Sequence, residues 1–244
     1  MTIVGPGRVG HSIADAAVRA GLRVELLGRD FDASLSGSKT VLICVPDQEI
    51  ERVADQLAGG AQLPAFTGHT SGATRLDVLD ACQTDGAFSL HPLQTVPTGS
   101  TDLNGCPAAC AGSGPAATGL ATALARTVGM LPFEIEEKHR AIYHAAASMA
   151  SNYLVTLEQT AAGLLGEAGV ENPRAVLAPL VTRTLANWEK DGAEALTGPI
   201  VRGDESTVET HRRALAAGHP EVLPLYDALA ERTRAIAATG GGAG

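Results

Sequence analysis

Short apolar runs and amphipathic stretches alternate along the first half of the chain. The run over residues 41–45 is continuously apolar, as in a strand that is buried on both faces. Helical patterns separate the runs, at residues 48–58 and 115–128 and between the first run and Gly21. We expect strands at residues 3–4, 23–27, 41–45, 65–68, 87–90 and 107–111. This order predicts an α/β fold with a doubly wound, mostly parallel sheet.

The second half of the chain carries helical patterns only. We expect helices at residues 138–165, 174–190, 206–216 and 222–238. Ser206 and Glu209 have the spacing of a capping box, which marks the start of a helix. The sequence therefore predicts an α/β domain over residues 1–135, an all-helical domain over residues 136–238 and a disordered glycine-rich tail over residues 239–244.

A glycine-rich turn follows the first expected strand directly and precedes an alanine-rich helix. Its residues are Gly5, Pro6, Gly7, Arg8, Val9 and Gly10. In this context the first glycine permits a tight turn, the second allows close approach to a pyrophosphate, and the third allows close packing of helix on strand. The helix terminus then offers unpaired N–H groups to phosphates. We expect a dinucleotide site here, to which Arg8 could add a phosphate or adenine contact.

The ends of the next two strands bear on the choice of dinucleotide. Ligands of such sheets bind beyond the carboxyl ends of the strands, so we expect Val45, Pro46 and Asp47 to line the cofactor site. The second strand ends in Gly28, Arg29 and Asp30, and Arg29 is suited to bidentate contact with a 2′-phosphate. This favours NADP(H), and Asp30 keeps NAD(H) as the alternative.

Composition narrows the class of protein. Apolar residues make up 45% of the chain but aromatic residues only 3%, so the core must consist mainly of Ala, Leu and Val. The net charge of −9 speaks against a nucleic-acid surface. We find no leader-like segment and no apolar run of membrane-spanning length, and the four cysteines lack a metal-binding spacing. We therefore expect a cytoplasmic enzyme with reduced thiols and no metal.

Three polar positions recur every four residues on the expected helix at 138–165. They are His144, Ser148 and Asn152, and alanines surround them. Residues at this spacing share a helix face, and the small neighbours leave room for a ligand. His144 is suited to general acid catalysis, and Asn152 to a hydrogen bond with the substrate or the nicotinamide amide. The alternative is a helix face that is merely exposed to water.

Two loops after expected strands carry further polar residues. Ser71 and His91 both lie at the expected ligand edge of the sheet, where either could contact the nicotinamide or the reacting oxygen. The structural alternatives are that Ser71 caps a helix starting near Thr74 and that His91 is a turn residue before Pro92.

A glycine- and proline-rich loop at residues 196–204 joins two of the expected helices. Such loops often shape binding sites. We expect Thr197 and Arg202 to contact the substrate, with Arg202 anchoring its carboxylate, while Asp204 orients Arg202 or caps the following helix.

Together these segments resemble the Rossmann-like proteins with a carboxy-terminal domain of unknown function numbered 2520 (DUF2520). The matching residues are 5–10, 44–47, 69–73, 89–95, 143–146, 151–154 and 196–204. The resemblance implies kinship with 6-phosphogluconate, 3-hydroxyacid and pyrroline-5-carboxylate reductases, and a helical dimerisation domain. We also expect a homodimer because the helical domain alone cannot bury its apolar faces.

Two related families suggest different proton donors. Ketopantoate reductases carry a catalytic lysine followed by asparagines at four-residue spacing, and here His144, Ser148 and Asn152 stand at those positions. Prephenate dehydrogenases carry a catalytic histidine before a proline, like His91 and Pro92. Both histidines therefore remain alternatives for one role.

These patterns lead to one expected function and several alternatives. We expect an NADPH-dependent oxidoreductase that transfers hydride to a small oxo acid, with ketopantoate as the favoured substrate. The alternatives are oxidation of a cyclic hydroxy acid, imine reduction of the pyrroline-carboxylate type, and a non-catalytic NADP(H) sensor.

Overall fold

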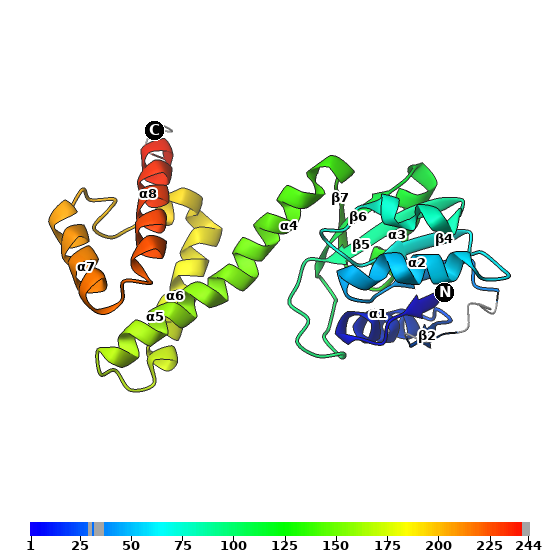
Figure 1. Ribbon diagram of the computed structural model, residues 1–244, viewed down its shortest axis with the longest axis horizontal. Helices are drawn as coiled ribbons and strands as arrows, with labels where there is room; N and C mark the ends of the chain where they lie inside the picture. Colours follow the sequence, from blue (N-terminus) through cyan, green and yellow to red (C-terminus); the bar gives the residue numbers. More distant parts are fainter. Residues whose placement is uncertain (29–30, 32–36, 241–244) are drawn as a thin grey trace. The chain divides into compact units, whose positions relative to one another are not determined.

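The computed structural model describes residues 1–28, 31 and 37–240, and the chain divides into two compact units (Figure 1). The first comprises Met1–Asn152 and the second Tyr153–Gly244. The boundary expected at residue 135 lies where the strand pattern ends, whereas the first compact unit also includes the helix that follows. Residues 239 and 240 lie in the last turn of a helix, and the rest of the expected tail lies outside the described residues.

A seven-stranded sheet forms the centre of the first unit among the described residues, in the order β2-β1-β3-β4-β5-β6-β7. Its strands are β1 (Thr2–Val4), β2 (Glu25–Leu27), β3 (Thr40–Ile43), β4 (Phe66–His69), β5 (Gly86–Pro92), β6 (Pro107–Gly112) and β7 (Leu131–Glu134). Neighbouring strands run parallel except β5 and β6, which are antiparallel. The mostly parallel, doubly wound sheet predicted from the sequence is confirmed.

The strand β7 was not predicted from the sequence. It is short and contains Pro132, which weakens a strand pattern. Its place at the edge of the sheet explains why the proline is tolerated there, since an edge strand has one side without ladder hydrogen bonds.

Two apolar clusters hold helices on the two faces of the sheet. On one face, α1 (Arg8–Arg19) and α3 (Pro115–Thr127) pack on a cluster that includes Phe88. On the other face, α2 (Ile50–Ala58) and the 3-10 helix η2 (Leu76–Cys82) pack on a cluster that includes Ile43. The alanines of α1 and α3 allow this close packing with few aromatic side chains.

The parallel strands β1, β3, β4 and β5 end at the same edge of the sheet. The segments that follow them carry the glycine-rich turn, the 3-10 helix η1 (Asp47–Glu49) and the Ser71–Gly72 turn, and His91 lies near the end of β5. Ligands of such sheets bind at this edge. The topology therefore brings most of the predicted site residues of the first unit to one side.

Several short helical segments replace the single long helix expected at 138–165. A 3-10 turn, η3 (Glu137–His139), leads into α4 (Arg140–Ser148), and a π-helix (Met149–Tyr153) separates α4 from α5 (Leu154–Glu167). The chain is helical throughout this stretch, but its hydrogen-bond pattern changes from one segment to the next. The apolar pattern does not reveal these changes, because the 3-10 turn and the π-helix each comprise only a few residues.

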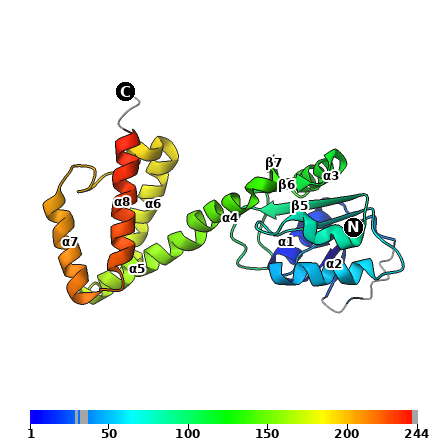
Figure 2. The same cartoon turned by 45° about the horizontal axis from the view of Figure 1, so that its top comes forward.

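The second unit is helical. Its further elements are α6 (Pro173–Asp191), the 3-10 turn η5 (Gly192–Ala195), α7 (Glu205–Gly218) and α8 (Leu223–Gly240). Within it α5 contacts α6, and α7 contacts α8 (Figure 2).

The start of α7 is set by a different residue from the expected one. Asp204 is the N-cap of this helix, because its carboxylate accepts the backbone N–H of Thr207 at 3.1 Å. Ser206, the expected cap, lies in the first turn, where its hydroxyl donates to Asp204 at 2.8 Å. The capping box inferred from Ser206 and Glu209 was therefore wrong, whereas the capping role considered for Asp204 is confirmed.

All four cysteines of the chain are buried in the first unit. Cys44 follows β3, Cys82 ends η2, Cys106 directly precedes β6, and Cys110 lies within β6. Burial raises the pKa of the Cys44 thiol to about 12 and that of Cys110 to about 11. In residues 1–28, 31 and 37–240, no helix has both the length and the apolar character needed to cross a membrane.

Candidate functional site

Close packing explains two glycines of the glycine-rich turn. Gly5 has a φ of +109°, and a Cβ atom there would lie 2.5 Å from the carbonyl oxygen of Cys44. A Cβ atom on Gly10 would lie 2.0 Å from the carbonyl oxygen of Gly5. Side chains at these two positions would therefore separate α1 from β1 and β3.

Gly7 plays a different part, since a Cβ atom there would meet its nearest protein atom only at 4.0 Å. Gly7 is the N-cap of α1, no described side chain caps the helix, and its first turn contains no acidic residue. The first N–H groups of α1 are thus available to an anion, and Arg8 is exposed beside them. This turn fits the pyrophosphate of a dinucleotide.

The segment after β3 lies against the glycine-rich turn. A Cβ atom on Gly5 would approach the Cγ1 atom of Val45 to 2.9 Å, and Pro46 and Asp47 follow, both exposed. The structure therefore brings Val45 next to the turn, as the sequence analysis expected. Arg29 and Asp30 lie outside the described residues, so the contact of Arg29 with a 2′-phosphate stays a prediction.

His91, near the end of β5, is held by two aromatic neighbours from α4. Its Nδ1 atom lies 2.7 Å from the hydroxyl of Tyr143. The ring packs edge-to-face on Tyr143, with centroids 5.7 Å apart, and on His144, with centroids 6.0 Å apart. The two histidines that the sequence left as alternatives are therefore neighbours in one cluster.

The cluster closes over the backbone of Gly72. A Cβ atom on Gly72 would lie 2.8 Å from the Cδ2 atom of His144 and 2.9 Å from the Nε2 atom of His91. Only a residue without a side chain lets both imidazole rings approach this turn. The position of this turn was predicted from the sequence, but no role was predicted for Gly72.

Ser71 is engaged within its own turn. Its hydroxyl accepts the backbone N–H groups of Ala73 and Thr74, at 3.2 and 2.9 Å, and donates to the Thr74 hydroxyl. The side chain is buried. This arrangement matches the structural alternative, in which Ser71 shapes the loop, although the segment from Leu76 is a 3-10 helix and not the expected α-helix.

Burial sets the protonation states of two members of the cluster. Burial, and then the nearby His144 and Arg140, lower the pKa of His91 to about 4, while Asp47 opposes the shift. Burial likewise raises the pKa of Tyr143 to about 12. At neutral pH His91 is therefore an uncharged imidazole and Tyr143 an intact phenol.

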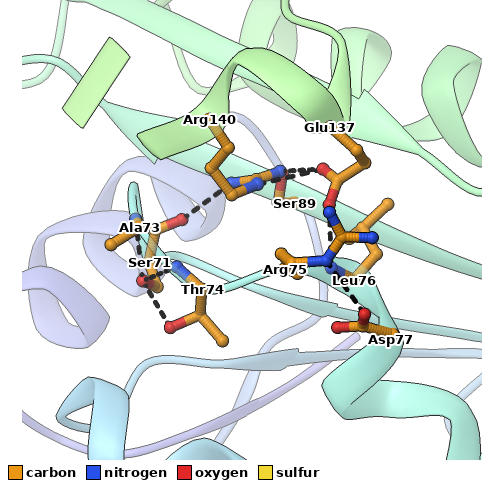
Figure 3. A network of polar contacts seen from close by, with 9 residues as sticks. All are labelled: Ser71, Ala73, Thr74, Arg75, Leu76, Asp77, Ser89, Glu137 and Arg140. Carbon is orange, nitrogen blue, oxygen red and sulfur yellow. Dashed lines mark hydrogen bonds and ion pairs between the residues drawn. The ribbon is translucent and has the colours of Figure 1, made fainter. Parts of the chain in front are cut away.

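A buried arginine joins the start of α4 to the sheet (Figure 3). The guanidinium of Arg140 donates to the carboxylate of Glu137, to the hydroxyl of Ser89 at 2.6 Å and to the carbonyl oxygen of Ser71 at 3.2 Å. Neither Arg140 nor Glu137 was predicted from the sequence, and Tyr143 was noted there only within the family-like segment 143–146. A charged run before a helix looks like a solvated helix start, so no signal in the sequence pointed to the burial of Arg140.

His144, Ser148 and Asn152 lie on consecutive turns of the helical stretch that ends the first unit. His144 and Ser148 are half-buried on α4, and Asn152 is in the π-helix. In an α-helix, residues eight apart are offset by about 80° around the axis. A π-helical turn contains more residues, which reduces this offset. The π-helix therefore keeps Asn152 closer to the face of His144 than a regular α-helix would.

Thr197 and Arg202 belong to the second unit. They lie in the segment between η5 and α7, where Arg202 is exposed. The histidine cluster belongs to the first unit, so the contact of Thr197 and Arg202 with a substrate stays a prediction. Among the residues that the structure describes, no group of His, Cys, Asp and Glu side chains is arranged to hold a metal ion.

The family described as "Domain of unknown function (DUF2520)" matches residues 106–233, more than half of the chain. No curated protein sequence matches significantly.

Solved structures with the same fold have low sequence identity to the chain. It is similar to TM1727 from Thermotoga maritima, with a TM-score of 0.80 and 21% identity over 98% of each chain. It is also similar to BF3122 from Bacteroides fragilis, a candidate NADP oxidoreductase, with a TM-score of 0.79 and 22% identity over 96% of each chain. A reductive aminase from Aspergillus terreus, in complex with NADPH and ethyl levulinate, matches at a TM-score of 0.66 and 18% identity, over 95% of this chain and 92% of that chain.

Proposed function

This chain belongs to the DUF2520 family, and we propose that it is an NADPH-dependent oxidoreductase that reduces a small oxo acid. The observation that carries the proposal is the pairing of a glycine-rich turn suited to pyrophosphate with the His91–His144 pair, both at the ligand edge of one sheet. BF3122 is described as a candidate NADP oxidoreductase and the reductive aminase is in complex with NADPH, which supports an NADP(H)-dependent enzyme.

NADPH, when bound at this edge, would supply a hydride to the substrate carbon. The N–H groups at the start of α1 bind the pyrophosphate, with Gly7 leaving space for it. Val45, Pro46 and Asp47 line the neighbouring strand end. Arg29 is the group proposed to bind the 2′-phosphate and so to favour NADP(H) over NAD(H).

We assign proton donation to His144. When the substrate carbon gains hydride, the substrate oxygen must gain a proton. Because His144 is partly exposed, solvent can reprotonate its imidazole after each turnover. His91 is uncharged at neutral pH, with Tyr143 on its Nδ1 atom. If the Tyr143 hydroxyl donates, the Nε2–H of His91 is free to orient the substrate oxygen.

The substrate proposed first is 2-dehydropantoate (ketopantoate), because His144, Ser148 and Asn152 repeat the four-residue spacing of ketopantoate reductases. Ser148 and Asn152 would bind its oxygens, and Thr197 and Arg202 would bind its carboxylate. Imine reduction is the second candidate, and the fold similarity to a reductive aminase favours it.

Fluorescence titrations of the full chain with NADPH and with NADH test which cofactor the protein binds more tightly. Loss of NADPH absorbance with a panel of oxo acids, including 2-dehydropantoate, and with 1-pyrroline-5-carboxylate tests the reaction. His144→Ala should lower turnover about 100-fold without weakening NADPH binding. The control is His139→Ala, which removes an exposed histidine of η3. NADPH binding without turnover on any compound would favour a sensor.

We also propose that the chain forms a homodimer through its second unit. Among the described residues of this unit, the buried apolar side chains are only Ala162, Val208, Leu215 and Ala230. Large apolar side chains of α6 are exposed instead, with Leu180 at 63% and Trp188 at 64%. A second copy of the chain would cover them.

A further inference from the structure

Arg140 ranks first by volume among the most fully buried side chains of the residues that the structure describes, with an exposed fraction of 2%. Each of its guanidinium nitrogens donates a hydrogen bond: Nε to Glu137 at 2.9 Å, Nη1 to the Ser71 carbonyl and Nη2 to the Ser89 hydroxyl (Figure 3). These partners come from η3, from the loop after β4 and from β5. One side chain therefore joins three separate segments.

Glu137 extends this connection to a fourth segment. Its Oε1 atom accepts from Arg140, and its Oε2 atom accepts the backbone N–H of Leu76 at 3.0 Å, at the start of η2. Both carboxylate oxygens are thus used. The ion pair of Arg140 and Glu137 is called the clamp below.

We propose that the clamp is the positioning device of the histidine cluster, because it holds the first turn of α4 against the Ser71–Gly72 turn and β5. The clamp acts on the reaction through His91 and His144, so this proposal rests on the proposed function for its catalytic meaning. Arg140 and Glu137 themselves are positioning residues.

The spacing along α4 supports this role. Tyr143 and His144 follow Arg140 by three and four residues, so they lie on the helix face that Arg140 anchors. The Ser71 carbonyl that Arg140 holds directly precedes Gly72, on which both imidazole rings pack. A shift of α4 would therefore move His144 relative to His91.

A purely stabilising role is a weaker explanation of the clamp. Burying two charges costs desolvation, and well-packed apolar residues often stabilise a fold as well as a buried ion pair does. What apolar residues lack is the directed hydrogen bonding of a guanidinium to three partners. The geometry thus favours a positional role.

The clamp also affects the charge state of His91. The groups that face His91 are Arg140, Tyr143 and His144 from the start of α4 and Asp47 from η1. Arg140 lowers the pKa of His91, so loss of the clamp should let His91 gain its proton at a higher pH.

The test uses the full chain labelled with ¹⁵N-histidine and studied by nuclear magnetic resonance across pH, with thermal unfolding as a second measurement. The main variant replaces the whole clamp, Arg140→Met with Glu137→Leu, so that neither charge is left buried without its partner. The matched control is Arg52→Met with Glu49→Leu. This pair has the same three-residue spacing and also joins a 3-10 turn to an α-helix, but both side chains are exposed.

The expected result is that the clamp variant folds, that His91 titrates at a higher pH than in the unchanged protein, and that magnetisation transfer between the rings of His91 and His144 is lost. The control should match the unchanged protein in all three. Unchanged titration and ring contact in the clamp variant would overturn the proposal.

If the clamp variant fails to fold, Ser89→Ala keeps the proposal testable because it removes only one hydroxyl partner of Arg140. It removes one of the contacts that hold Arg140, so it should weaken the magnetisation transfer between the rings of His91 and His144, and an unchanged transfer would count against the clamp. None of these measurements needs turnover, so failure of the clamp and failure of the proposed oxidoreductase activity are distinguishable.

Discussion

His91 of β5 and His144 of α4 pack edge-to-face, with their ring centroids 6.0 Å apart. Their separation depends on the bare backbone of Gly72 against both rings. The pair combines a buried imidazole that is uncharged at neutral pH with a partly exposed one. Different environments of this kind allow two identical side chains to take different roles.

Gly72→Ala should separate the two imidazoles. The new Cβ atom would lie 2.8 Å from atoms of both rings, so one ring must move. A displacement of about 1 Å can lower turnover about 100-fold. We expect NADPH binding to be retained. Gly119→Ala is the control, since its Cβ atom on α3 meets no atom within 4 Å. Equal turnover of the two variants would contradict this interpretation.

Gly7→Ala should weaken NADPH binding, whereas Gly10→Ala should destabilise the fold. The methyl group of an alanine at position 7 would not collide with the protein, so the thermal stability should be unchanged. It would occupy the space proposed for the pyrophosphate, so the affinity for NADPH should fall. Alanine at Gly10 collides with the Gly5 carbonyl, so the unfolding temperature itself should fall. Calorimetry and fluorescence titration of both variants check this. Unchanged NADPH affinity of a folded Gly7→Ala protein would argue against the pyrophosphate site.

Acid should destabilise the first unit. Burial lowers the pKa of His69 to about 4 from 6.5, so the unfolded chain binds more protons between these values. The free energy of unfolding is therefore highest above the unfolded pKa and falls as the pH drops toward 4, by up to about 3 kcal/mol for His69. Urea unfolding followed by circular dichroism at several pH values measures the slope. His69→Phe should make the dependence of the unfolding free energy on pH less steep. An equally steep dependence in that variant would show that His69 is not its source.

Charge on α6 should prevent dimer formation. Leu180→Glu with Trp188→Glu places two carboxylates on the proposed interface and should yield a monomer in light scattering. The matched control is Val18→Glu with Leu131→Glu, because these are similarly exposed apolar residues of the first unit. The proposal would be wrong if the unchanged protein is a monomer, or if the protein with both substitutions on α6 is still a dimer.

The sequence predicted the features that local patterns encode. Continuous apolar runs identified most of the strands, and the spacing of the glycines identified the turn at Gly5–Gly10, because both depend on neighbouring residues. Ser71, which follows β4, and His91, which lies within β5 and not in the expected loop, were also placed at the correct edge, since parallel strands end together.

Long-range contacts explain what the sequence did not predict. The burial of Arg140 depends on Ser71 and Ser89, which are distant in the chain, and the role of Gly72 depends on two rings from other elements. The π-helix between α4 and α5 was also missed, because a one-residue change in hydrogen bonding leaves the apolar pattern almost intact.

The buried cysteines give the first unit its own reporters of opening. A thiol reagent reacts with the thiolate, and Cys44, Cys82, Cys106 and Cys110 are all shielded within or beside the sheet. Their rate of labelling in the unmodified protein therefore measures how often this unit opens. Mass spectrometry of the labelled peptides can then rank β3, η2 and β6 by the order in which they become accessible, without any engineered probe.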